Sequence, residues 1–230
     1  GQQIKKPLPL CKWLVGDFAW RRAQLLEQRS IKDWRAADGR PFMDAIKDTG
    51  IVNDAEGKPA TVSFTRPDLM NDFTLAMKHH ALYTAVLPEL VRFNHFRIIA
   101  VIRHPLDTIQ SWQSLKGRAI AKGKLPQAAK FWNEAARISL LEGDPLDRMV
   151  QMYDAFCQRY YELRDAIEIV KFEDVVKDPM LVSRLFDVDI RPRAAAMLEQ
   201  RQRILRRDEA DALKAKFKQY GTFTRHFYDI

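Results

Sequence analysis

The chain has 230 residues, of which 47% are hydrophobic and 30% charged; this ordinary globular composition excludes a disordered or fibrous protein. Its length suits a single domain over residues 1–230. No apolar run approaches the roughly 18 residues that span a bilayer, and the N-terminus has no apolar segment typical of a secretory signal, so we expect a cytoplasmic protein. The net charge of +8 favours anionic ligands.

Three apolar, β-branched segments predict buried strands. They are residues 73–77, 96–102 and 167–172, and the second of them is the clearest. Before the first strand, residues 35–68 are rich in Gly and Pro, which predicts a long excursion of loops.

Helical periodicity fills the remaining segments. Leu82, Val86 and Leu90 share one face of a helix between the first two strands, a second helix runs from Met149 to Leu163, and a third from Ala194 to Lys218. This order of elements predicts an α/β fold, a parallel sheet flanked by helices, with a largely helical C-terminal half. In such sheets ligands bind beyond the carboxyl ends of the strands.

The cysteines and histidines do not form a metal-binding pattern. Cys11 and Cys157 are far apart in the sequence, which predicts two buried, reduced thiols rather than a disulfide framework or a zinc site. The adjacent histidines His79 and His80 point in different directions on a helix or a strand. We therefore predict no metal site.

An anion-binding pattern follows the clearest strand. Arg103 comes directly after it, Pro105 suits the first turn of a helix, and Ser111 lies about two turns further on. A guanidinium forks onto two phosphate oxygens, and a hydroxyl and a helix N-terminus add to the attraction. A purely structural interpretation is also open, in which Arg103 forms an ion pair with Asp107.

The order Arg103-x-Pro105-x-Asp107-x-x-x-Ser111 after a buried strand resembles the 3′-phosphate-binding segment of sulfotransferases. The resemblance implies their P-loop NTPase-like fold and the donor substrate 3′-phosphoadenosine 5′-phosphosulfate (PAPS). Adenosine 3′,5′-bisphosphate would be the product. By the same resemblance, Arg103 and Ser111 hold the 3′-phosphate.

Two further segments agree with that family in order. Residues 169–179 resemble its later strand and the helix start after it, and residues 76–82 resemble the strand end that carries its catalytic base. The resemblance implies that His80 is the general base, since imidazole titrates near neutrality. Lys78 would neutralise charge on the leaving phosphate. A misalignment by one residue would give the role of base to His79.

The family's glycine-containing loop for the 5′-phosphosulfate is not recognisable here. The nearest segment is residues 14–22, in which Arg21 and Arg22 are the candidate cofactor-binding residues. This segment lacks the family's Ser and Thr hydroxyls, and Asp17 would repel an anion. The family's C-terminal phosphate-binding motif has only a loose counterpart in residues 220–226.

These patterns predict a sulfotransferase acting on a hydroxyl or an amine of a small-molecule or saccharide acceptor. Four aromatic residues could line a pocket for the acceptor or belong to the core: Tyr83, Trp112, Phe131 and Trp132. One alternative is a nucleotide-binding or scaffolding relative that has lost catalysis.

Nucleic-acid binding is a second alternative, although we expect no nucleic-acid partner. Basic residues concentrate in the last helical segment and just before it: Arg191, Arg193, Arg201, Arg203, Arg206, Arg207, Lys214, Lys216 and Lys218. Acidic residues interleave with them, as on an ordinary solvated helix. A second basic group follows the Arg103 segment, and it is either a rim around the site or a solvated, flexible segment: Lys116, Arg118, Lys122 and Lys124.

Overall fold

A computed structural model describes residues 6–33, 62–65, 71–115, 117–187 and 207–230. The chain divides into two compact units. The smaller unit contains residues 12–76, and the larger contains residues 1–11 and 77–230. The prediction of a single domain over residues 1–230 stays a prediction, and each unit is described by itself.

The smaller unit contains most of one long helix and an antiparallel pair of strands. Helix α1 (Pro7–Gln28) starts at a proline, whose missing N–H costs nothing in the first turn of a helix. Strands β1 (Ser30–Asp33) and β2 (Val62–Thr65) pair antiparallel, with Ser30 opposite Thr65. Apart from β2, the predicted loop region of residues 35–68 lies outside the described residues.

The predicted strand over residues 73–77 is wrong, because this segment is irregular. Arg22 supplies the physical reason. Its guanidinium donates hydrogen bonds to the carbonyl oxygens of Phe73 (2.7 Å) and Asn71 (2.9 Å), and it lies 4.5 Å from the centre of the Phe73 ring. Backbone groups that a strand would pair with a neighbour are here paired with a side chain.

In the larger unit, the predicted helix over Leu82–Leu90 is divided in two. Val86 is both the C-cap of helix α3 (His80–Ala85) and the N-cap of helix α4 (Leu87–Phe93), which has Pro88 in its first turn. A proline cannot donate the hydrogen bond that would continue α3, so the chain restarts a new helix instead. Asn94, in the left-handed conformation, ends α4.

Strand β3 (Ile99–Ile102) leads directly into helix α5 (Pro105–Ser114), as predicted. Three short helical pieces follow, η1 (Ala119–Lys122), α6 (Pro126–Ala129) and α7 (Asn133–Leu140), and then the long helix α8 (Pro145–Glu162). After α8 come strand β4 and the remaining helices: β4 (Glu168–Lys171), α9 (Phe172–Lys177), α10 (Met180–Phe186), α12 (Arg207–Tyr220) and the short turn η2 (Thr224–His226).

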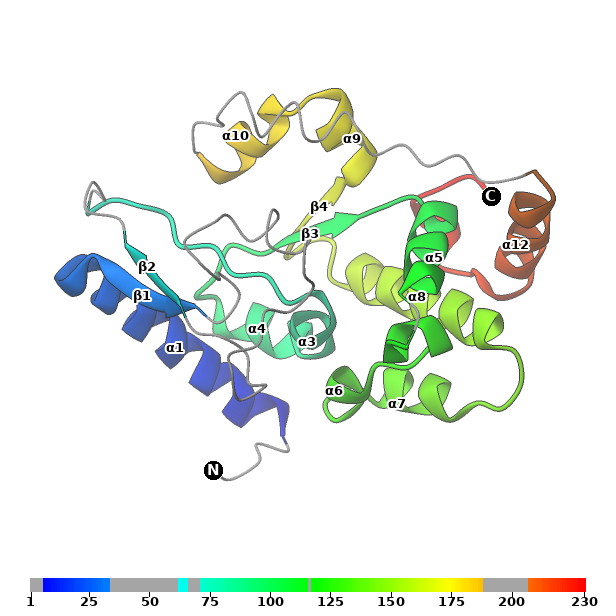
Figure 1. The fold of residues 1–230 in the computed structure, drawn as a ribbon, viewed down its shortest axis with the longest axis horizontal. Coiled ribbons are helices and arrows are strands. Elements are labelled where there is room, and N and C mark those ends of the chain that lie inside the picture. Colours follow the sequence, from blue (N-terminus) through cyan, green and yellow to red (C-terminus); the bar gives the residue numbers. More distant parts are fainter. Residues whose placement is uncertain (1–5, 34–61, 66–70, 116, 188–206) are drawn as a thin grey trace. The chain divides into compact units, whose positions relative to one another are not determined.

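Strands β3 and β4 form a parallel pair, with Ile99 opposite Glu168 and Ile102 opposite Lys171 (Figure 1). The prediction of parallel strands joined through helices is therefore confirmed in its coarse form. The structure is a helix-rich α/β arrangement with a small parallel sheet. The predicted helix over Met149–Leu163 corresponds to α8. Of the helix predicted over Ala194–Lys218, only the part in α12 lies within the described residues.

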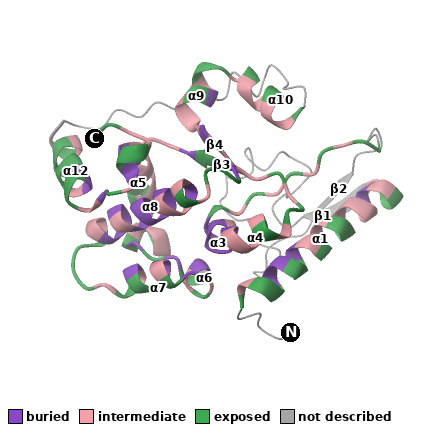
Figure 2. Cartoon of the chain, turned by 180° about the vertical axis from the view of Figure 1, so that it is seen from behind, coloured by how far each residue is buried: buried purple, intermediate pink, exposed green. Residues whose placement is uncertain are grey.

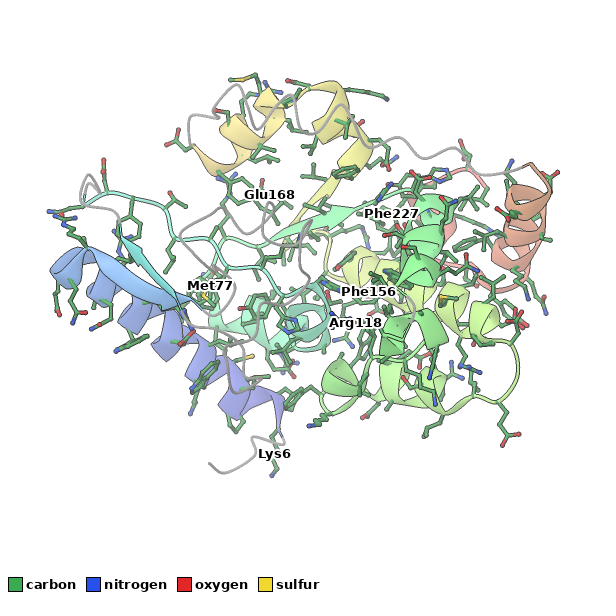
Figure 3. The ribbon with its side chains drawn as sticks, viewed as in Figure 1. Lys6, Met77, Arg118, Phe156, Glu168 and Phe227 are labelled. Atoms are coloured by element: carbon green, nitrogen blue, oxygen red, sulfur yellow. The ribbon has the colours of Figure 1, made fainter. Side chains whose placement is uncertain are left out.

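Helix α8 is at the centre of the core of the larger unit, and it is among the most buried helices in Figure 2. One cluster of buried side chains includes Met152 and Phe156 from α8, and a second includes Val150 and Tyr153. Phe227, near the C-terminus, packs against both clusters; both Phe156 and Phe227 are labelled in Figure 3. The core thus connects the sheet, the helices after it and the C-terminal segment.

Both cysteines are buried and free, which confirms the sequence prediction. Burial raises the pKa of Cys11 to about 11 and that of Cys157 to about 12, so both thiols stay protonated near neutral pH. Within the described residues, no helix combines the length and the apolar character that crossing a membrane requires.

Candidate functional site

The carboxyl ends of β3 and β4 place two residues at the same edge of the sheet. Arg103 follows β3 and Phe172 follows β4, and the guanidinium carbon of Arg103 lies 5.3 Å from the centre of the Phe172 ring. The side chain of Arg103 is 29% exposed, so solvent reaches part of it. An anion at this edge would meet a cation held against an aromatic face.

The guanidinium of Arg103 is only partly satisfied by the protein. One of its terminal nitrogens forms an ion pair with Asp107 at 3.3 Å, as the structural interpretation of the sequence expected. The Nε–H of Arg103 is buried and has no hydrogen-bond partner among the described residues. A long, partly exposed ion pair between residues i and i+4 contributes only about 0.5 kcal/mol to stability. Because a guanidinium has five N–H donors, this pair leaves most of them for a ligand.

Ser111 lies on α5, two turns beyond Arg103, and is half-buried. Its backbone carbonyl accepts a hydrogen bond from the Ser114 hydroxyl (2.7 Å). The Ser111 hydroxyl itself makes no hydrogen bond within the described part of the chain. No contact joins Ser111 to Arg103 among these residues, so their shared hold on one phosphate stays a prediction.

Three side chains that the sequence analysis did not single out hold the backbone around Arg103. The Tyr153 hydroxyl donates to the Arg103 carbonyl oxygen (2.6 Å), and the His104 N–H donates to Glu173 Oε1 (2.7 Å). The Tyr228 hydroxyl donates to the other oxygen of Glu173 (2.8 Å). Glu173 is the second residue after β4, a position that sheet topology could have drawn attention to. Tyr153 was predicted only as part of a helix, and no pattern marked Tyr228.

Lys78 lies just before α3, and His80 lies at its start. His80 is the first residue of that helix, and the ring of His79 caps it by accepting the N–H of Leu82 (3.2 Å) at Nδ1. Because His79 is engaged as the cap, His80 is the better candidate for a base. The pKa of His80 is lowered from its ordinary value, first by desolvation and then by electrostatic interactions with His79 and Lys78. No hydrogen bond or ion pair connects this pair of residues to Arg103 in the described chain.

Residues 14–22, the nearest candidate for the 5′-phosphosulfate loop, do not form a loop, because the whole segment lies inside α1. In a helix interior the backbone N–H groups are already paired and cannot cradle a phosphate. Arg21 forms an ion pair with Asp17 (2.7 Å) one turn earlier, and Arg22 holds the carbonyls of Asn71 and Phe73. Nucleotide binding by Arg21 and Arg22 stays a prediction, without the loop that motivated it.

A pocket of about 630 Å³ opens between α8 and the segments around it. Phe131 and Trp132, two of the four aromatic residues considered from the sequence, line it. Arg159 also lines it, with its guanidinium 4.9 Å from the centre of the Trp132 ring. Trp112 instead packs against both core clusters.

Among the residues that the structure describes, no group of three His, Cys, Asp or Glu side chains is placed to hold a metal ion.

Comparison with known proteins identifies no relative of this chain, because it matches no protein-family model, no curated protein and no solved structure. A functional assignment therefore depends on the geometry at the ends of β3 and β4.

Proposed function

We propose that the chain is a sulfotransferase that binds PAPS at the carboxyl ends of β3 and β4. The observation that carries the proposal is the placement of Arg103, between a parallel strand and the proline-initiated helix α5, with a buried Nε–H that has no partner within the described chain. Placement beyond a strand end and beside a helix N-terminus is what a phosphate site in an α/β protein requires.

In this proposal, Arg103 and Ser111 bind the 3′-phosphate. The guanidinium supplies two parallel donors and the hydroxyl a third. The N-terminus of α5 adds partial positive charge, since this helix has ten residues and begins at Pro105. The acidic side chain of Asp107 opposes the ligand, and its modest ion pair with Arg103 has to yield when phosphate binds.

The nucleotide would supply a sulfonyl group. The bond between sulfur and the phosphate oxygen breaks as a new bond forms between sulfur and an acceptor oxygen or nitrogen. His80 takes the proton of the acceptor, a role that suits an imidazole whose lowered pKa keeps it neutral at physiological pH. Lys78 offsets negative charge on the leaving phosphate oxygen.

A catalytically degenerate, nucleotide-binding relative is the second candidate. It is favoured by one observation, the helical conformation of residues 14–22, which leaves the described chain without a loop for the 5′-phosphosulfate in that segment. Both candidates predict binding of adenosine 3′,5′-bisphosphate, and only the first predicts sulfonyl transfer.

Calorimetric titration with adenosine 3′,5′-bisphosphate tests the shared part of the two proposals. We expect the Arg103→Ala variant to bind at least tenfold more weakly than the unaltered chain, a loss of about 1.4 kcal/mol or more. Asp107→Asn should change affinity in the opposite direction, by about twofold, because it releases the guanidinium from a pair of about 0.5 kcal/mol. Equal affinities for all three proteins would overturn the site.

Transfer of labelled sulfonate from PAPS to a panel of hydroxyl and amine acceptors separates the two candidates. Transfer that His80→Ala abolishes supports the enzyme. Nucleotide binding without transfer to any acceptor class supports the degenerate relative.

A further inference from the structure

The backbone on both sides of Arg103 is held by side chains from distant parts of the sequence. Tyr153 from α8 donates to the Arg103 carbonyl, and Glu173 from α9 accepts the N–H of His104. His104 is the N-cap residue of α5, so its N–H lies outside the helix and needs a partner from elsewhere. The place of Arg103 therefore depends on residues 50 and 70 positions further along the chain.

The C-terminal segment is itself fixed to α8. The buried carboxylate of Asp154 accepts the N–H of Phe223 (2.8 Å) and both the N–H (2.7 Å) and the hydroxyl (2.8 Å) of Thr224, which is fully buried. Just beyond, the ring of His226 stacks on that of Tyr161 with 3.9 Å between their centres. These contacts bring the last residues of the chain to the end of the sheet.

Tyr228 connects this segment to the turn that carries Arg103. Its hydroxyl donates to Glu173 Oε2 at 2.8 Å and lies 3.3 Å from the carbonyl oxygen of Ile102. Its ring meets the ring of His104 edge-on at 5.3 Å and lies 5.0 Å from the Lys171 ammonium. Burial, and then the hydrogen bond to Glu173, raise the pKa of Tyr228, so the hydroxyl keeps the proton that it donates.

We infer that Tyr228 and Glu173 are positioning residues that brace the Arg103 turn, so that the C-terminal segment supports the proposed nucleotide site from behind. Tyr228 orients the carboxylate of Glu173, and Glu173 fixes the His104 N–H and with it the direction of the chain at Arg103. A guanidinium whose backbone is already held in place binds phosphate more tightly, because less conformational freedom is lost on binding. The inference rests on the proposed nucleotide site for its function, but the brace can be measured without a ligand.

The first test follows exchange of the His104 amide hydrogen by NMR in the ligand-free protein. Glu173→Ala removes the acceptor and should speed this exchange at least tenfold. Glu173→Gln retains a carbonyl oxygen that accepts the same hydrogen, so its exchange should stay within about threefold of the unaltered chain. Unchanged exchange in Glu173→Ala would overturn the brace, whatever the protein binds.

The second test compares two tyrosine variants. Tyr228→Phe removes the donor to Glu173, whereas Tyr220→Phe removes a hydroxyl from the same core cluster that has no hydrogen bond within the described chain. We expect Tyr228→Phe to weaken binding of adenosine 3′,5′-bisphosphate three- to tenfold and Tyr220→Phe to leave it unchanged. Binding of adenosine 5′-monophosphate, which lacks the 3′-phosphate, should not respond to either.

A double-mutant cycle separates positioning from general loss of structure. If Tyr228 acts through Arg103, Tyr228→Phe should weaken binding no further in the Arg103→Ala background. Additive losses would overturn the positioning role. A protein that binds no adenosine nucleotide while His104 exchange still responds to Glu173→Ala would refute the proposed function and leave the brace standing.

Discussion

His80 is a single residue whose surroundings shift its pKa. Desolvation lowers the pKa of His80 below the ordinary value of 6.5, and electrostatic interactions with His79 and Lys78 lower it further. We expect an NMR titration of His80 to have its midpoint below 6.5 and to move upward in Lys78→Gln. A midpoint at or above 6.5 would contradict this. The unfolded chain binds this proton more readily, so the contribution of His80 to stability is complete above pH 6.5 and is lost as pH falls through the lowered pKa.

The individual residues of the site were predictable from the sequence to different degrees. Arg103 could be placed because a strand, an arginine and a proline-initiated helix follow one another along the chain, and local sequence determines such an order. Tyr153 and Tyr228 could not be placed, because they reach the same turn from 50 and 126 positions away. Contacts of that range depend on how helices pack, which no local pattern records.

Among the elements, the connection from α5 to α8 is held by a buried arginine. Arg148 donates to the carbonyl oxygens of Lys122 (3.0 Å), Leu141 (3.0 Å) and Gly143 (2.8 Å). The basic side chains of Arg118, Lys122 and Lys124 point outward and are exposed. The alternative of a solvated surface thus agrees with these side chains, while the backbone beneath Lys122 is fixed rather than free.

Gly123 tests how closely that connection is packed. Its φ is +67°, and a Cβ atom there would lie 2.4 Å from Cβ of Arg148 and 2.9 Å from backbone atoms of Arg148 and Met149. We expect Gly123→Ala to lower the free energy of unfolding by about 2 to 4 kcal/mol, from left-handed strain together with overpacking. Gly117→Ala is the matched control, since φ is +82° but the space is open, and it should cost only about 1 kcal/mol. Equal losses in urea denaturation would mean that the contact with Arg148 relaxes freely.

At the scale of the whole molecule, the sequence predicted a sheet topology but not the division of the chain. Parallel pairing of β3 and β4 followed from two β-branched segments separated by helices. The division at residues 12–76 has no low-complexity linker to mark it, and the first of its two boundaries falls inside the continuous helix α1. The strand expected over residues 73–77 had the right composition, but a strand also needs a neighbour, and Arg22 occupies two carbonyl groups there instead.

With a net charge of +8, the chain could attract a nucleotide or a nucleic acid, and the salt dependence of its affinity distinguishes the two. Lys216 of α12 is already paired with Asp144 (2.9 Å), the N-cap of α8, and with Asp147 of α8. The exposed residues Glu209 and Asp211 share the helix with the exposed Lys214 and Lys218, so the described part of this helix presents a surface of mixed charge to a phosphate backbone. We expect affinity for adenosine 3′,5′-bisphosphate to fall by about threefold to tenfold between 50 and 500 mM NaCl, because salt screens a partly exposed Arg103. Duplex DNA should bind negligibly at about 150 mM salt. DNA affinity that falls with log[salt] at a slope of several, about 0.9 for each phosphate neutralised, would instead identify an extended nucleic-acid surface.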